Sequence, residues 1–177
     1  MGLVVAAGLA YTVVEIMRYD PHVVKSVRLE EGLDSYRFKL RSGDEVWLIG
    51  VGLPRKETSG TREPARQLVQ KLIEGKHIDI ERDKQELDTG KRLLSYVWVK
   101  VRGGQAGLDE VLKELGLPTG KVKVDEKGRV FINELVVRLG LLESSPEAPN
   151  LKHRDELEAA QAAAKKEGLG MWGEQGS

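Results

Sequence analysis

The stretch EVWLIGVGLPR, residues 45–55, decides the fold of this chain. Apolar and β-branched residues dominate positions 46–51 and predict a buried strand. Gly50 and Gly52 allow the backbone to bend, and Pro54 stops the strand because it cannot donate a ladder hydrogen bond. The stretch therefore predicts a strand that leads into a loop, where we expect a site. Beyond its first residue, however, it contains no carboxylate.

The composition excludes several kinds of site. The 177 residues include 28 basic and 28 acidic side chains, and this formal neutrality argues against tight, sequence-independent binding of nucleic acid. There is no cysteine, so a disulfide, a thiolate nucleophile and a cysteine-ligated zinc site are excluded. Three widely spaced histidines do not favour a histidine-rich metal site. Any metal would have to be held by oxygen ligands.

The apolar N-terminal segment, residues 1–22, has a role that the sequence leaves open. Its apolar run over residues 2–14 is shorter than the roughly 20 residues of a membrane-spanning helix. The run fits a signal-peptide core in length, but no basic residue follows Met1. A truncated export or anchor segment, a strand pair over residues 9–17 and 22–28, and a helix are the three interpretations. An export remnant would place the protein outside the cell or on a membrane; otherwise it would be cytoplasmic.

The rest of the chain predicts mainly strands, followed by helices. Residues 36–41 alternate between apolar and basic side chains, which predicts a half-buried strand with a basic outer face. Turn residues at 30–32 and 42–44 flank it, so three antiparallel strands are expected. The predicted strands are residues 23–28, 36–41, 45–51, 77–81, 93–101, 121–124 and 130–132. The predicted helices are residues 61–73, 108–115, 133–142 and 152–167.

Three strands, a helix, two strands and further helices are the order of a five-stranded OB-fold barrel with packed helices. The expected fold class is therefore α+β, mainly β. We expect one such domain over residues 23–172, with an insertion near residues 103–124, a tail at 173–177 and a monomeric state. The apolar side of the insertion helix is expected to pack on the barrel, whereas leucines exposed together would indicate an interaction surface.

Three motifs carry a resemblance to a known family. They are DTGKRLLSYV at residues 88–97, VFINELVVRLG at 130–140, and PN at 149–150 before a helix that ends in GLGMW at 168–172. Together with residues 46–54, their order and spacing resemble the staphylococcal-nuclease-like (thermonuclease, SNase-like) family, bacterial in type. The resemblance covers about residues 23–172 and implies the OB fold.

Active members of that family cleave phosphodiesters with one Ca²⁺ held by two aspartates, a glutamate that helps to activate water, and two arginines that bind phosphate. Aligned position by position, the resemblance implies that this chain has replaced three of those residues. Trp47 stands in place of the first arginine, Gly52 in place of the loop aspartate and Arg55 in place of the loop glutamate. Asp34 falls at the early aspartate in a loosely aligned segment, and Arg92 retains the second arginine.

The resemblance thus implies a catalytically degenerate member, because one carboxylate and one arginine cannot form a calcium site, a base and a phosphate clamp. The two tyrosines that flank the family's substrate site are also replaced, near Ser145 and Glu147. We expect no cofactor, and a module that binds single-stranded nucleic acid or a protein ligand. The alternative is a weak or altered Ca²⁺-dependent phosphodiesterase. Its remnant catalytic candidates are Asp34, which is also the candidate metal ligand, Glu57, which a shifted loop could bring in as a base, and Arg92.

The candidate binding residues each have a structural interpretation beside the functional one. Trp47 could stack on a base or cover a partner's apolar surface, or it could fill the barrel as a half-buried residue. A second set of residues could form a basic face for a phosphate backbone, or a solvated face balanced by nearby acids. These residues are Arg37, Lys39, Arg41, Arg55, Lys91 and Arg92.

Two further acidic positions are expected to be structural. Asp88 matches an acidic residue of the family near its second arginine and is expected to orient the turn before Arg92 instead of binding metal. Glu81 and His153 match positions where the family pairs a buried glutamate with a histidine. We expect this pair to tie the last helix to the barrel and not to act as an acid and base.

Overall fold

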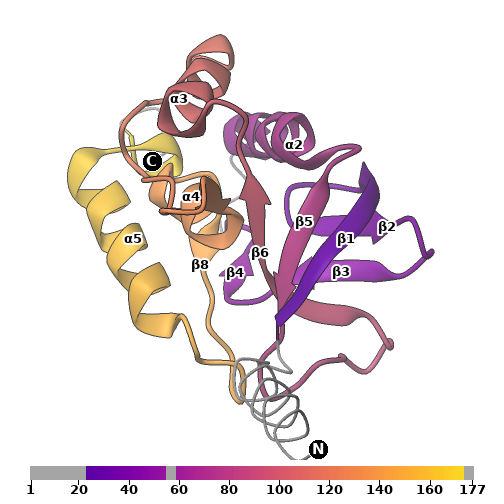
Figure 1. Ribbon diagram of the computed structural model, residues 1–177. Helices are drawn as coiled ribbons and strands as arrows, with labels where there is room; N and C mark the ends of the chain where they lie inside the picture. Colours follow the sequence, from indigo (N-terminus) through magenta and orange to yellow (C-terminus); the bar gives the residue numbers. More distant parts are fainter. Residues whose placement is uncertain (1–22, 55–58, 174–177) are drawn as a thin grey trace, which may run out of the picture.

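The computed structural model describes residues 23–54 and 59–173 (Figure 1). A barrel occupies one side of the molecule, and helices cover its flank and one end. The interpretations of residues 1–22 fall outside the described residues, except that a strand begins at Val23.

Five strands form a closed barrel in the order β3-β2-β1-β5-β6. Strands β3 and β6 close it by pairing in parallel, while the other neighbours are antiparallel. The strands are β1 (Val23–Gly32), β2 (Arg37–Leu40), β3 (Glu45–Leu48), β5 (His77–Glu81) and β6 (Leu93–Lys100). This barrel and its packed helices confirm the predicted α+β, mainly β, OB fold.

Strand β3 lies at the closure of the barrel. Val46 and Leu48 are buried in the barrel core. On one side Trp47 lies opposite Arg37 of β2, and on the other side it lies opposite Leu94 of β6. The stretch at residues 45–55 therefore joins the first three strands to the β5–β6 hairpin.

Helices α2 and α3 cover one end of the barrel, and α4 packs between strand β6 and helix α5 (Figure 1). Strand β7 (Arg129–Phe131) pairs antiparallel with β6 and leads directly into α4. No described helix is long and apolar enough to cross a membrane. The helices are α2 (Ser59–Ile73), α3 (Gly104–Glu114), α4 (Ile132–Arg138), α5 (Arg154–Glu167) and the 3₁₀ helix η1 (Gly170–Trp172).

The turn predicted at residues 30–32 is wrong, because β1 continues to Gly32. A bulge between Leu29 and Glu31 shifts the register of its pairing with β2, which lets the strand absorb the irregularity. The chain reverses at residues 33–36 instead. There the N–H groups of Leu33 and Asp34 both donate to the carbonyl of Arg37.

The strand predicted at residues 121–124 is also absent, although the segment alternates as a strand would. Its backbone groups bond to a side chain of the insertion helix α3. Gln105 donates from Nε2 to the Val122 carbonyl at 3.2 Å and accepts from the Val124 N–H at 2.9 Å. On the inner side of α3, Leu108 and Leu112 are fully buried, so the apolar side of this helix packs on the body of the protein.

Residues 143–150, predicted as a loop, contain a short strand. Strand β8 (Glu143–Ser144) pairs with β4 (Val51–Gly52), the continuation of the β3 stretch. A third contact extends this pairing, because the Ser145 N–H donates to the Gly50 carbonyl at 2.9 Å. The chain that leads from α4 towards α5 is thereby fixed against the end of β3.

A buried asparagine joins α4 to both sides of the barrel closure. Asn133 has none of its surface exposed. Its Oδ1 accepts the Val97 N–H of β6 at 3.0 Å, and its Nδ2 donates to the Ile49 carbonyl just after β3 at 2.8 Å. One side chain therefore satisfies two buried backbone groups that lack a strand partner.

The C-terminal turn closes on the end of α4 through a backbone contact that only glycine allows. Gly140 has φ +66°, and a Cβ there would lie 2.1 Å from the Leu169 carbonyl oxygen. The Met171 N–H donates to the Gly140 carbonyl at 2.9 Å. Gly120 has nearly the same φ, +68°, but a Cβ there would meet no atom within 4 Å.

We expect Gly140→Ala to destabilise the protein far more than Gly120→Ala. Both changes incur the left-handed backbone cost of about 1 kcal/mol, but only Gly140→Ala also forces the backbone of η1 away, for a total of about 3 kcal/mol or more. Urea unfolding followed by circular dichroism measures the two free energies. Equal losses would mean that the contact between Gly140 and Leu169 contributes nothing to stability.

Candidate functional site

A pocket of about 340 Å³ opens at the end of the barrel beside the β3 stretch. Residues 47–51 form one wall, and Tyr36 and Leu94 lie beside them. Gln85 and Asp88, from the loop between β5 and β6, and residues of the 145–150 segment form the remaining walls. The pocket thus lies where the sequence predicted a site.

Side-chain to backbone bonds hold the pocket walls in place. Asn150, which is buried, accepts from the Gln85 N–H through Oδ1 at 2.8 Å and donates from Nδ2 to the Gln85 carbonyl at 2.9 Å. Segments 65 residues apart in sequence are thereby fixed to each other. The wall is therefore formed before any ligand arrives.

Arg92 stacks on Trp47 and is paired with Asp88. The guanidinium carbon of Arg92 lies 3.8 Å from the centre of the Trp47 ring, and its Nε donates to Asp88 Oδ2 at 2.6 Å. Asp88 Oδ1 also accepts the N–H groups of Gly90 and Arg92 at 2.8 and 3.0 Å. The hydrogen bond from Arg92, together with these backbone bonds, holds the pKa of Asp88 below its ordinary value despite partial burial.

Asp34 is likewise engaged within the chain. Its Oδ1 accepts the N–H groups of Tyr36 and Arg37 at 3.0 and 2.9 Å, and its Oδ2 accepts Nε of Arg37. The Arg37 guanidinium lies 5.3 Å from the centre of the Trp47 ring. Tyr36 meets the same ring edge-on at 5.6 Å. Trp47 is thus half-buried, with two arginines and a tyrosine around it.

The structure brings together four of the predicted site residues and separates others. Asp34, Arg37, Trp47 and Arg92 form one connected cluster. Lys39 instead pairs with Glu30 of β1, with 3.6 Å between Nζ and Oε2. Arg55 and Glu57 lie outside the described residues. In the part of the chain that the structure describes, no three His, Asp or Glu side chains are arranged to hold a metal ion.

Three polar residues of the pocket were not predicted as site residues from the sequence: Tyr36, Gln85 and Asn150. Tyr36 is predicted only as part of a strand and Gln85 is given no role, yet both line the pocket. Asn150 was noticed only as part of the PN pair that carries the resemblance. Its bonds to Gln85 depend on tertiary contacts that no local pattern encodes.

His153 links the start of α5 to the barrel. Its Nε2 lies 3.2 Å from Oε2 of Glu81 on β5, its Nδ1 lies 2.8 Å from Oε2 of Glu156, and its ring meets Tyr96 edge-on. Burial alone would lower the pKa of His153, but the bonds to the two carboxylates outweigh it and raise that pKa. Burial alone would raise the pKa of Glu81, but its bonds to His153 and Lys152 lower that pKa.

Comparison with known proteins agrees with this geometry. The family model described as staphylococcal nuclease homologue matches residues 45–174. This is more than half of the chain, so the chain belongs to the staphylococcal nuclease homologue family, as the sequence motifs predicted. A search of curated proteins found no match.

We expect His153→Gln to cost more stability near pH 6 than near pH 9. Because the pKa of His153 is raised above its ordinary 6.5, its stabilising contribution is fully present below about pH 6.5 and is lost as the pH rises through the raised value. Urea midpoints at both pH values measure the difference. His77→Gln, at an exposed position of β5, is the control. An equal loss for His153→Gln at both pH values would contradict the expected tie to Glu81 and Glu156.

Proposed function

We propose that this domain is a catalytically degenerate member of its family that binds a ligand in the pocket and does not cleave phosphodiesters. The observation that carries the proposal is that both charged remnants are already engaged. Asp34 is bonded to Arg37 and to two backbone N–H groups, and Arg92 is bonded to Asp88 and stacked on Trp47. Calcium or a phosphate would have to compete with these bonds.

Recruiting these groups for catalysis would require breaking existing charge-assisted bonds, each worth about 1.5–3 kcal/mol. Even then one carboxylate and one arginine would stand alone. Loss of a single stabilising group in such a site costs on the order of 10²-fold in rate, and here the replaced positions are interdependent. The positions of the lost arginine and loop aspartate carry Trp47 and Gly52, which cannot replace their charges.

The pocket supports binding as the retained role. Its walls are fixed by the Asn150 bonds, and Tyr36 and Trp47 offer aromatic surface. No lysine or arginine is among the described residues that line it, which favours a protein ligand over a nucleic-acid strand. A nucleic-acid strand could still bind through its phosphates to the guanidinium groups of Arg37 and Arg92. Each of these side chains is about 37% exposed at the margin of the site.

A calcium-dependent digestion assay tests the loss of catalysis. We expect the protein to cleave DNA and RNA no faster with Ca²⁺ than with a chelator, because its one candidate metal ligand in the described part of the chain is bonded to Arg37. Asp34→Ala, assayed in parallel, should be indistinguishable from the unchanged protein. Calcium-dependent turnover that Asp34→Ala abolishes would instead establish a phosphodiesterase.

Titration with labelled single-stranded DNA and RNA tests the nucleic-acid ligand. We expect binding no tighter than about 10⁻⁴ M at about 50 mM salt, weakening further at about 200 mM, because the chain is neutral and the pocket lining carries no basic residue. Fluorescence anisotropy measures the affinity. Tighter, salt-dependent binding that Arg92→Ala weakens, and that Arg102→Ala at an exposed position before α3 does not, would identify a strand as the ligand.

A further inference from the structure

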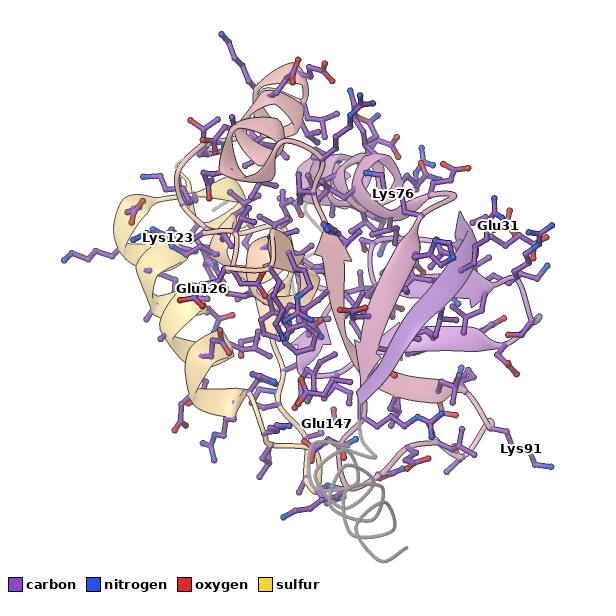
Figure 2. All side chains as sticks on the ribbon, viewed as in Figure 1. Glu31, Lys76, Lys91, Lys123, Glu126 and Glu147 are labelled. Carbon is purple, nitrogen blue, oxygen red and sulfur yellow. The ribbon has the colours of Figure 1, made fainter. Side chains whose placement is uncertain are left out.

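Among the described residues that line the pocket, negative charge is unbalanced. These residues include two carboxylates, Asp88 and Glu147, and no cation. Asp88 is neutralised by Arg92. Glu147, labelled in Figure 2, is exposed. It makes no ion pair with any other described residue. A phosphate entering the pocket would therefore meet repulsion, whereas a cation would find an unpaired carboxylate.

The aromatic wall of the pocket already binds cations of the chain itself. Tyr36 and Trp47 meet edge to face, and the Arg37 guanidinium carbon lies 5.7 Å from the centre of the Tyr36 ring. Arg92 provides an example within the molecule, because its guanidinium stacks on Trp47 while it pairs with Asp88. An aromatic ring and a carboxylate thus bind an arginine here, and Glu147 offers a second carboxylate in the lining of the same pocket.

Two exposed leucines adjoin the pocket. Leu87 and Leu151 are 46% and 39% exposed and are two of the three large hydrophobic side chains exposed in the described chain. Each directly neighbours a lining residue, Asp88 and Asn150 respectively. Gln85 joins their segments, because it is bonded to the Asn150 side chain and donates from Nε2 to the Leu87 carbonyl at 2.9 Å.

We propose that the pocket docks a peptide segment of a partner protein that presents a lysine or arginine side chain between apolar residues. The cation pairs with Glu147 in the pocket, and the apolar residues cover Leu87 and Leu151. This inference rests on the proposed binding role and names its ligand. Charge complementarity selects a basic peptide, because neither a phosphate backbone nor an acidic segment would balance Glu147.

Titration of the ¹⁵N-labelled full chain with short synthetic peptides, followed by NMR, tests the proposal. The probe is GSLRLSG, blocked at both ends, and its matched peptides are GSLELSG, which reverses the charge, and GSARASG, which removes the apolar side chains. We expect GSLRLSG to shift the Trp47 indole N–H and the amides of residues 85–88, Ser145, Glu147, Ala148 and Asn150, with a dissociation constant between about 0.1 and 1 mM. The two matched peptides should bind at least about threefold more weakly.

Substitutions locate the contact. Glu147→Gln keeps the shape of the side chain and removes its charge, so it should weaken GSLRLSG about threefold, and Leu151→Ser should do the same by removing apolar surface. Glu126→Gln is the matched control, because Glu126 is also exposed and lies in the turn before β7, apart from Glu147 (Figure 2). It should leave the affinity unchanged.

Each other outcome overturns the proposal. These outcomes are no shift at about 5 mM GSLRLSG, equal binding of GSLELSG, and an affinity that Glu147→Gln does not alter. If only an oligonucleotide shifted the same resonances, the ligand of the pocket would be a nucleic-acid strand. If only a higher protein concentration shifted them, the ligand would be a second copy of this chain. Those results would leave the binding role intact. Calcium-dependent turnover in the digestion assay would instead remove the binding role itself.

Discussion

The two hydrogen bonds of the Asn133 side chain hold together the parts of the molecule on which the site depends. They join helix α4 to Val97 in β6 and to Ile49 at the end of β3, in the dry interior. Without the amide, two backbone groups would remain buried and unpaired, at a cost of about 1–3 kcal/mol each. Ile49 and Gly50 are also pocket residues. The position of the pocket wall is therefore set by the same contact that fixes α4 on the barrel.

Around this framework, charge is arranged to hold the chain together. Asp34 orders the turn between β1 and β2 and pairs with Arg37, while Asp88 orders the turn before β6 and pairs with Arg92. Both arginines then approach the ring of Trp47. An aromatic ring at this position thus gathers two arginines, and among the described lining residues the unpaired carboxylate is that of Glu147.

Patterns with a short period could be predicted, and contacts between distant segments could not. The alternation in β2, the apolar run of β3 and the order of strands and helices gave the barrel, because local periodicity encodes burial. The prediction of a strand at residues 121–124 was wrong because the Gln105 side chain bonds to the backbone of this segment. The site residues Asp34, Trp47 and Arg92 were found through family motifs, but their mutual pairing was not, and Gln85 and Asn150 carried no local signal. Residues 55–58 lie outside the described chain.

The parallel pairing of β3 with β6 has a consequence for the chain during its synthesis. Val46 lies beside Leu93, so the edge of β3 has no β6 partner until the ribosome has released the intervening residues. At about 5–20 residues per second this interval lasts for seconds, during which an apolar strand edge is open to other nascent chains. Asn133 and the η1 turn emerge later still. The domain therefore completes its folding only when almost all of its described residues are available.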